Sequence, residues 1–401
     1  METTCCIIGG GPAGMMLGLL LARAGVEVTV LEKHKDFFRD FRGDTIHPST
    51  LELMHELGLL EKLLEIPHSE ISSASINIGG QAIKVADLKH LPTKAKFIAL
   101  MPQWDFLNLL ADEARKYPTF RLLMEHEATG LLQQDGMTTG VIANSPTGQV
   151  KINALLTVGC DGRHAISREA GHLSVVDTSV PIDVLWLRVS RHLTDPENGL
   201  GYINYGRLLV LINRLDYFQI GYIIAKDSFD SMKREGLEAF QQSIARIAPF
   251  LSDRVAEIDS WDKVKLLTVQ VNHLAKWAAP GLLCIGDAAH AMSPVGGIGI
   301  NIALQDAVAA ANLLSDALKA ESVNIHQLDA VQNYRQRAVA NTQRFQVFAH
   351  KMLNRVLGKP GPMKVPLTLR LLTGIPGFTG VTARFIGMGL QPEHIRTSIS
   401  K

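Results

Sequence analysis

Residues 3–33, TTCCIIGGGPAGMMLGLLLARAGVEVTVLEK, decide the fold of this chain. The apolar run at 5–8 predicts a buried strand, and the run at 15–22 predicts a helix that packs on a sheet. A second strand is expected at 26–31, and an acid, Glu32, follows it. Strand, glycine-rich turn, helix, strand and acid in this order predict the βαβ unit that binds a dinucleotide.

The glycine turn between the first strand and the helix carries the binding chemistry. Gly9 permits the tight turn, Gly11 lets a pyrophosphate approach the backbone, and Gly14 lets helix and strand pack closely. The helix N-terminus offers unpaired N–H groups and the positive end of its dipole to phosphates. Glu32 stands 23 positions after Gly9, where a carboxylate can accept both hydroxyls of the adenosine ribose.

Composition places the chain among ordinary globular proteins. Its 401 residues are 46% hydrophobic and 20% charged, which suits two or three joined domains with ample core. The net charge of +1 gives no indication of nucleic-acid binding. The four cysteines form no metal or redox pattern, so we expect buried small hydrophobic side chains in a reducing compartment. No tight cluster of the 14 histidines predicts a metal site.

The N-terminal region predicts a cytoplasmic location. No signal peptide precedes the first strand, because the glycine turn begins at residue 9. The apolar stretch at 13–22 is too short to span a membrane.

Two stretches with strand patterning interrupt the α/β pattern. Residues 71–87 alternate around Gly79-Gly80 and predict a β-hairpin. Residues 181–224 contain three runs of strand-forming residues separated by turn residues, which predict an antiparallel sheet inserted into the α/β domain.

A second strand, glycine loop and helix occur late in the chain. A strand at 282–285 runs into Gly286-Asp287, and the loop 293–301, SPVGGIGIN, precedes a helix at 302–318. One dinucleotide needs one glycine turn for its pyrophosphate, so the second loop suits the other end of a long cofactor. A third short motif, Cys160-Asp161-Gly162, ends another apolar strand.

Together these motifs resemble the FAD-dependent aromatic hydroxylases, also called class A flavoprotein monooxygenases, which include p-hydroxybenzoate hydroxylase and tetracycline- and polyketide-hydroxylating enzymes. The resemblance covers about residues 3–315. It implies an α/β fold: a Rossmann-like FAD-binding domain with an inserted antiparallel β-sheet substrate domain and a helical C-terminal region. The expected boundaries are 1–72, 98–175 and 278–320 for the FAD-binding domain, 73–97 and 176–277 for the substrate domain, and 321–401 for the C-terminal region.

The resemblance also implies which residues hold the FAD pyrophosphate and adenosine. Gly9, Gly11, Ala13 and Gly14 would hold the pyrophosphate, and Glu32 the ribose. The backbone near Ala128 would support the adenine.

The flavin end is implied in the same way. Arg42 resembles the family arginine near the flavin and its phosphates, although a loop arginine is also often simply solvated. Gln103 matches a position that contacts the ribityl chain or pyrophosphate, Asp287 resembles the ribityl-binding aspartate, and Asp161 resembles an aspartate linked to both FAD and NAD(P)H.

The second glycine loop would face the isoalloxazine. Gly297, Gly299 and Asn301 fall at this position, and Pro294 would form part of the wall beside the flavin. Arg42 and Pro294 are accordingly the catalytic candidates. One departure is Ala165, which stands where the family usually has a serine in its NAD(P)H-linked motif.

The chemistry implied is oxygen transfer by the cofactor. In this family NAD(P)H reduces FAD, dioxygen adds to form a flavin C4a-hydroperoxide, and one oxygen atom passes to an electron-rich ring. The expected substrate is an aromatic, phenolic or polyketide-like small molecule. The candidates for substrate contact, all in the predicted inserted sheet, are Tyr205, Tyr217, Gln219 and Tyr222.

Other flavoprotein functions stay open at this point. A flavin-dependent reductase or halogenase is one, although the halogenase signature Trp-x-Trp-x-Ile-Pro is absent. A non-catalytic flavoprotein that sequesters a ligand is another. Substrate identity, regiochemistry, oligomeric state and the choice between NADH and NADPH are not specified by the residues.

The C-terminal tail is basic. Residues 351–401 carry eight Lys or Arg and one acid, Glu393. One interpretation is an amphipathic surface for a membrane or partner, which would suit a quinone-biosynthesis hydroxylase at the membrane surface. The other, which we favour here, is that these helices cap the FAD-binding domain, because Gly and Pro break any long apolar stripe.

Overall fold

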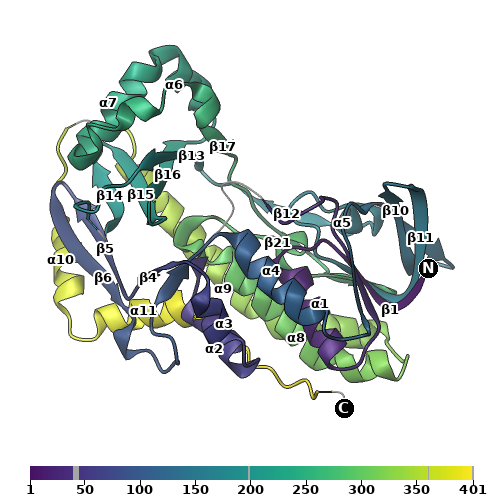
Figure 1. Ribbon diagram of the computed structural model, residues 1–401. Helices are drawn as coiled ribbons and strands as arrows, with labels where there is room; N and C mark the ends of the chain where they lie inside the picture. The colour runs from purple at the N-terminus through teal and green to yellow at the C-terminus, as the bar shows by residue number, and fades with distance from the viewer. Residues whose placement is uncertain (39–44, 197–198, 360, 400–401) are drawn as a thin grey trace.

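The computed structural model describes residues 1–38, 45–196, 199–359 and 361–399. Arg42 lies outside the described residues, so its predicted role stays a prediction. The chain has a mixed α/β fold in which one large sheet packs under long helices, and a second sheet stands beside it beneath α6 (Phe229–Glu235) and α7 (Leu237–Ile247) (Figure 1).

The first sheet has eight strands within the described residues, and its centre is parallel. β1 pairs in parallel with β11 and β2, β11 pairs in parallel with β20, and β2 with β8. Its strands are β19 (Ala278–Ala279), β20 (Leu282–Cys284), β11 (Gly148–Gly159), β1 (Glu2–Ile8), β2 (Val28–Leu31) and β8 (Phe120–Leu123), with β10 (Met137–Ser145) and β9 (Glu127–Gln134) extending from β11.

Long helices cover this sheet. α1 (Pro12–Arg23) packs against α4 (Gln103–Ala114) and α8 (Gly299–Lys319), and α8 packs against α9 (Ile325–Val356). Every residue of α1 from Ala13 to Ala22 is buried, which explains why that segment is apolar on all sides.

One helix in the described part of the chain is long and apolar enough to cross a membrane by length and composition. The segment is Val295–Lys319, which contains α8, and 72% of its most apolar stretch is buried inside the protein. α8 is therefore a core helix of the fold. It begins three residues before the predicted start, because the glycine loop supplies its first turn.

The second sheet contains the predicted strands but is not wholly antiparallel. β14 pairs in parallel with β5, so the early hairpin joins the later strands edge to edge. The prediction of an antiparallel sheet is wrong at this pair. The order is β17 (Lys265–Leu267), β13 (Ile182–Ser190), β16 (Tyr217–Ala225), β15 (Arg207–Asn213), β14 (Gly199–Asn204), β5 (Ser73–Ile78) and β6 (Gln81–Asp87).

Two small sheets and several short helices complete the fold. They are α2 (Pro48–Glu56), α3 (Leu60–Glu65) and α5 (Ile166–Ala170), the sheet of β3 (Thr45–Ile46), β7 (Ile98–Leu100) and β4 (Ser69–Ile71), and the sheet of β12 (Val175–Thr178), β18 (Val271–Leu274) and β21 (His290–Ala291).

The C-terminal region is helical, and its last segment then returns to α8. α10 (Leu367–Gly374) and α11 (Phe378–Met388) pack against β6 of the second sheet. The segment after α11 lies along α8, where the Asn312 side chain donates to the carbonyl of His394 (2.8 Å) and accepts from the Arg396 N–H (2.8 Å).

Candidate functional site

The three sequence motifs meet at the carboxyl ends of β1, β11 and β20. A Cβ added at Gly9 (φ +104°) would lie 2.5 Å from the carbonyl oxygen of Cys160, so the turn after β1 touches the loop after β11. A Cβ added at Gly286 (φ +59°) would lie 3.2 Å from the Cβ atoms of Ala13 and Ala303, so the turn after β20 touches α1 and α8. Ligands of open α/β sheets bind at this edge.

Gly14 and Gly11 have different environments in the first turn. A Cβ at Gly14 would lie 2.0 Å from the carbonyl oxygen of Gly9, which confirms that this glycine permits close packing of helix on strand. A Cβ at Gly11 would meet no atom within 4 Å. Gly11 is the N-cap of α1, with no side-chain hydrogen bond to the cap. The space beside the helix N-terminus is therefore open, which fits a bound pyrophosphate.

Glu32 is buried beside this turn. Its Oε2 accepts from the Gly10 N–H (3.1 Å) and its Oε1 accepts from the His34 N–H (3.0 Å), which fixes the carboxylate at the end of β2. The backbone of His126 bonds to the Glu32 carbonyl (2.9 Å), so Ala128, two residues further on in β9, is held near the same end of the sheet. This arrangement fits the adenosine half of FAD.

Asp287 stands at the end of β20 and forms an ion pair that the sequence did not predict. Its Oδ2 accepts from Arg163 Nε at 3.2 Å, and the carboxylate is one-third exposed. Arg163 also donates to the carbonyl of Met292 (3.4 Å). The only sequence signal for Arg163 was its position directly after Asp161-Gly162. An exposed carboxylate at this edge fits a ribityl chain.

Asp161 uses its carboxylate within the protein. It accepts from the hydroxyl of Ser167 (2.6 Å) and from the Ser167 N–H (3.0 Å), at the start of α5. Burial raises the pKa of Asp161, and the bonds from Ser167 oppose that rise. Ser167, two residues after Ala165, is therefore the hydrogen-bond partner of this aspartate.

Asn301 fixes the second glycine loop, residues 293–301. Its Oδ1 accepts from the His47 N–H (2.9 Å) and from the Thr50 hydroxyl (2.8 Å). Its Nδ2 donates to the carbonyls of Thr45 (3.1 Å) and Gly297 (3.2 Å). The sequence predicted that Asn301 faces the flavin. Its side-chain amide is bonded to protein atoms, so its role in the structure is to position this loop.

Helix α9 also holds the second glycine loop. Gln346 accepts from the Ser293 N–H (3.1 Å) and donates to the carbonyls of Ser293 (3.0 Å) and Val295 (3.1 Å). The hydroxyl of Ser293 lies 2.6 Å from His350 Nε2. These contacts come from the region beyond residue 320, where the sequence resemblance no longer identified residues.

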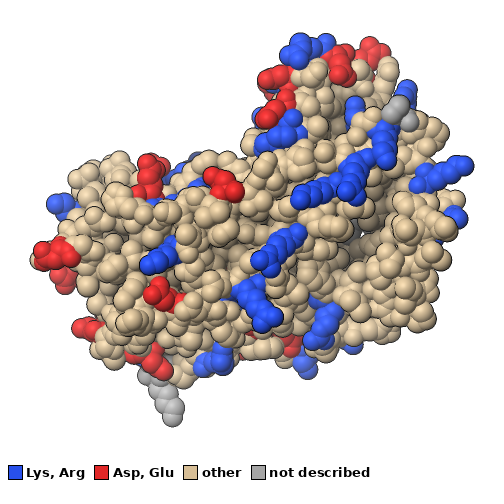
Figure 2. Space-filling model, turned by 180° about the vertical axis from the view of Figure 1, so that it is seen from behind, with Lys and Arg blue, Asp and Glu red and all other residues tan. Residues whose placement is uncertain are grey.

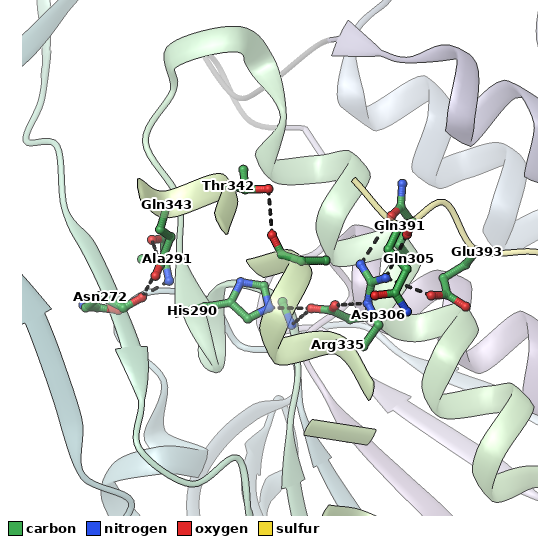
Figure 3. Close-up of polar contacts among 12 residues, drawn as sticks. Asn272, His290, Ala291, Gln305, Asp306, Arg335, Thr342, Gln343, Gln391 and Glu393 are labelled. Carbon is green, nitrogen blue, oxygen red and sulfur yellow. Dashed lines mark hydrogen bonds and ion pairs between the residues drawn. The ribbon is translucent and has the colours of Figure 1, made fainter. Parts of the chain in front are cut away.

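A buried ion network stands behind the Gly286-Asp287 turn (Figure 3). Asp306 Oδ2 lies 2.5 Å from His290 Nε2 and accepts from the Gly286 N–H at 3.2 Å. Asp306 Oδ1 accepts from Arg335 Nε at 3.0 Å, and Arg335 pairs with Glu393 at 2.8 Å. Burial would raise the pKa of Asp306, but His290 and Arg335 together hold it below its usual value. The network fixes the turn that presents Asp287.

Comparison with known proteins also indicates FAD binding. Residues 2–346 match the FAD binding domain family. A 6-methylpretetramide 4-monooxygenase from Streptomyces rimosus is 28% identical over 400 residues, covering 99% of this chain and 95% of that protein. A p-hydroxybenzoate hydroxylase from Acinetobacter baylyi is 26% identical, covering 76% of this chain and 75% of that protein.

The chain belongs to the FAD-dependent aromatic hydroxylase family. Among solved structures, PqsL of Pseudomonas aeruginosa, described as a probable FAD-dependent monooxygenase, shares the fold with a TM-score of 0.76 at 19% identity, covering 89% of this chain and 98% of that one. Several other relatives are longer, and this chain spans 56–64% of their length. One of these, from Streptomyces rugosporus, is named a dialkyldecalin synthase and not a monooxygenase.

The cofactor of this hydroxylase is FAD, and NAD(P)H is its electron donor. Gln103 is the first residue of α4. Pro294 is the N-cap of the short 3-10 turn Val295–Gly297 that precedes α8. Among the residues that can be placed, no group of three His, Cys, Asp or Glu side chains could hold a metal ion.

Three of the four substrate candidates of the hydroxylase lie on β16, and they are divided between its two faces. Tyr222 is fully buried on the face under α7, with its ring 5.1 Å from that of Phe240 and its hydroxyl 3.0 Å from Ser243. It is a core residue, and its predicted substrate contact does not fit this position. Tyr205 lies in the turn between β14 and β15, and its ring lies under the guanidinium of Arg246 from α7.

Gln219 and Tyr217 lie on the opposite face of β16, because side chains alternate along a strand. Gln219 is buried and accepts from Arg214 Nη2 at 3.2 Å.

Trp186 of β13 pairs with Gly221 of β16, so it shares this face. The sequence did not predict it as a site residue. Its indole N–H is buried and has no hydrogen-bond partner within the described residues. Trp186 belongs to the same apolar cluster as Val295 of the second glycine loop.

Proposed function

We propose that this FAD-dependent monooxygenase hydroxylates a multi-ring aromatic substrate of the polyketide type. The observation that carries the assignment to flavin chemistry is that all three motifs touch one another at one edge of the sheet, beside the open space at Gly11. The choice of substrate class is supported by the similarity to a 6-methylpretetramide 4-monooxygenase along nearly the whole chain. A simpler phenol is the second candidate, supported by the similarity to a p-hydroxybenzoate hydroxylase.

The proposed substrate position lies between the second glycine loop and the face of the second sheet that carries Trp186 and Gln219. Trp186 and Val295 share an apolar cluster, so this face adjoins the loop. An aromatic ring system suits such a surface because stacking buries large apolar area with few torsions to fix. The unpartnered indole N–H of Trp186 would donate to a substrate oxygen, since a buried donor without a partner is costly.

We propose three domain parts, with boundaries as predicted from the sequence. The first sheet and its helices would bind FAD, the second sheet would bind substrate, and the C-terminal region would support both. The proposed location is cytoplasmic.

Bound FAD supplies the activation of dioxygen, chemistry that protein side chains cannot perform. The residues of the chain would bind the cofactor and shield it from water. Gly11 and the N-terminus of α1 would bind the pyrophosphate, Glu32 the ribose, and Asp287 the ribityl chain. The N-terminus of α8 after Gly297 would favour negative charge on the ring system, and Pro294 would shield one side from water. Arg42 remains a candidate near the phosphates.

The testing experiment is NAD(P)H oxidation by the purified FAD-loaded protein in air, with tetracyclic polyketide precursors and simple phenols as test compounds. The proposal expects one class to accelerate oxidation and to gain a single oxygen atom by mass. A compound converted without oxygen gain would assign a reductase or halogenase reaction. Tight binding of a compound with no NAD(P)H consumption would assign a ligand-binding flavoprotein or a non-oxidative catalyst.

A further inference from the structure

The C-terminal helices α9, α10 and α11 are rich in exposed Lys and Arg side chains. Between residues 330 and 392 the sequence has no Asp or Glu. Arg335 is the buried member of the ion network, and the other cations of this segment are exposed. They are Arg337, Arg344, Lys351, Arg355, Lys359, Lys364, Arg370 and Arg384. Cations gathered on one surface attract anionic partners.

The cations of α9 form one stripe. Arg337, Arg344, Lys351 and Arg355 recur at spacings of seven, seven and four residues, which places them on the same side of the helix. A diagonal row of Lys and Arg side chains crosses the back of the molecule where α9 runs, and Asp and Glu side chains gather elsewhere on this face (Figure 2).

Large apolar side chains stand exposed along the same stripe. On α9, Phe348 is 61% exposed, with Phe345 and Met352 beside it. Phe345 contacts Phe385 of α11, with ring centroids 4.6 Å apart, so the surface continues onto the last two helices.

The tip formed by α10 and the start of α11 is the most exposed part of this surface. Leu367 is 70%, Leu371 64% and Val381 71% exposed, and Leu372 and Ile375 are also exposed. No residue of α10 is buried. These exposed apolar side chains belong to two short helices, and clustered exposed apolar side chains mark interaction sites.

A second copy of the chain is a poor occupant for this surface. A twofold symmetric dimer would bring the same cationic stripe against itself, because such an interface uses one patch twice. A bilayer with anionic lipids fits both properties. Its anionic headgroups attract the exposed cations. The boundary between its headgroups and acyl chains accepts exposed leucine side chains.

We propose that the exposed face of α9, α10 and the start of α11 binds the surface of an anionic lipid membrane, with Leu367, Leu371 and Ile375 entering the headgroup–acyl boundary. The surface is separate from the FAD site and does not depend on the oxidation chemistry. It would let the enzyme take up a lipophilic substrate at the membrane. The structure thus favours the interpretation of the basic tail that the sequence alone left second.

The test is co-sedimentation of the full-length FAD-loaded protein with phosphatidylcholine vesicles, with and without phosphatidylglycerol. The expected result is binding to the anionic vesicles that weakens as salt rises. Leu371→Glu should lower the affinity by about tenfold, from lost apolar burial and added repulsion. Lys351→Glu should lower it by at least about fivefold for the lost cation.

Matched controls use similar changes on other faces. Leu193→Glu replaces a leucine that is 93% exposed outside this surface, and Lys233→Glu reverses a charge on α6. Both should bind vesicles like the wild type, and unchanged thermal unfolding of every variant confirms folding.

Three results would overturn the proposal. These are no binding to anionic vesicles at low salt, equal binding to neutral vesicles, or wild-type binding by Leu371→Glu. A dimer in solution that Leu371→Glu dissociates would instead assign the surface to a second copy.

Discussion

The hydroxyl of Ser293 and the Nε2 of His350 lie 2.6 Å apart, and both side chains are buried. This contact joins the second glycine loop to α9, the helix that follows α8 in the chain. Burial lowers the pKa of His350 to about 4, so the imidazole is neutral at neutral pH and can exchange one hydrogen bond with the hydroxyl.

Replacing His350 should disturb the loop beside the flavin. We expect His350→Ala to weaken FAD binding by about tenfold and to raise NAD(P)H oxidation without product formation, because the loop loses one of its anchors. Fluorescence titration of FAD and the ratio of product formed to NAD(P)H consumed measure the two effects. His326→Ala, at the start of the same helix, is the control. Unchanged coupling in His350→Ala would contradict the positioning role.

The two glycines of the first turn should respond differently to alanine. Gly11→Ala meets no protein atom, so stability should change by less than about 0.5 kcal/mol while FAD affinity falls by about tenfold or more. Gly14→Ala collides with the Gly9 carbonyl and should cost about 1–3 kcal/mol of unfolding free energy. Urea unfolding without FAD and FAD titration separate the effects. Normal FAD affinity in Gly11→Ala would place the pyrophosphate elsewhere.

Asp287 should matter more for FAD than its ion-pair partner does. We expect Asp287→Asn to weaken FAD binding by about tenfold to a hundredfold, since a charge-assisted hydrogen bond to the ribityl chain would be lost. Arg163→Met removes the same ion pair and leaves the carboxylate in place, so its effect should be smaller. Equal losses in both variants would show that the ion pair, and not a direct contact of Asp287, supports FAD.

Asp306 should be a major determinant of stability. Asp306→Asn leaves the guanidinium of Arg335 buried with half its counter-charge, which should cost about 3–5 kcal/mol. Asp316→Asn on the same helix changes a carboxylate that is 92% exposed and should cost less than about 1 kcal/mol. Chemical unfolding of both variants checks the difference. A small loss in Asp306→Asn would mean that Glu393 alone compensates Arg335.

His47 should make stability depend on pH. Burial lowers its pKa to about 4, against 6.5 for an exposed histidine, so protonation favours the unfolded chain. Its contribution is complete above pH 6.5 and is lost as the pH falls toward 4, up to about 3 kcal/mol. Unfolding free energies of wild type and His47→Gln across this window should show a shallower slope in the variant. Parallel slopes would contradict the assignment.

The sequence predicted the fold best where local patterns and spacing agree. The strands and helix around the first glycine turn, and the strand before Gly286, appear close to their expected bounds because apolar runs and glycines fix them locally. The parallel pairing of β14 with β5 could not be predicted, because it joins segments more than 120 residues apart with no pattern in either strand to specify direction.

The site was predicted in part, for a similar reason. Motif glycines and acids can be read from their spacing, but Arg163, Gln346 and His350 act through contacts that only the folded chain creates. Tyr222 shows the converse limit. Its residue type and strand position predicted substrate contact, but the face on which it lies is buried because α7 covers that side of the sheet.

The pairing of β1 with β11, and of β11 with β20, has a consequence for how the protein folds. The strand at residue 2 finds one neighbour near residue 150 and the sheet receives the next near residue 282. Closing such long loops costs conformational entropy before the strand contacts can stabilise the sheet, so this sheet should form slowly. A chain arrested midway through synthesis would have the first glycine turn but lack the turn and helix that complete the pocket. Affinity for the cofactor should therefore arise late and abruptly during folding, as a property of the finished sheet.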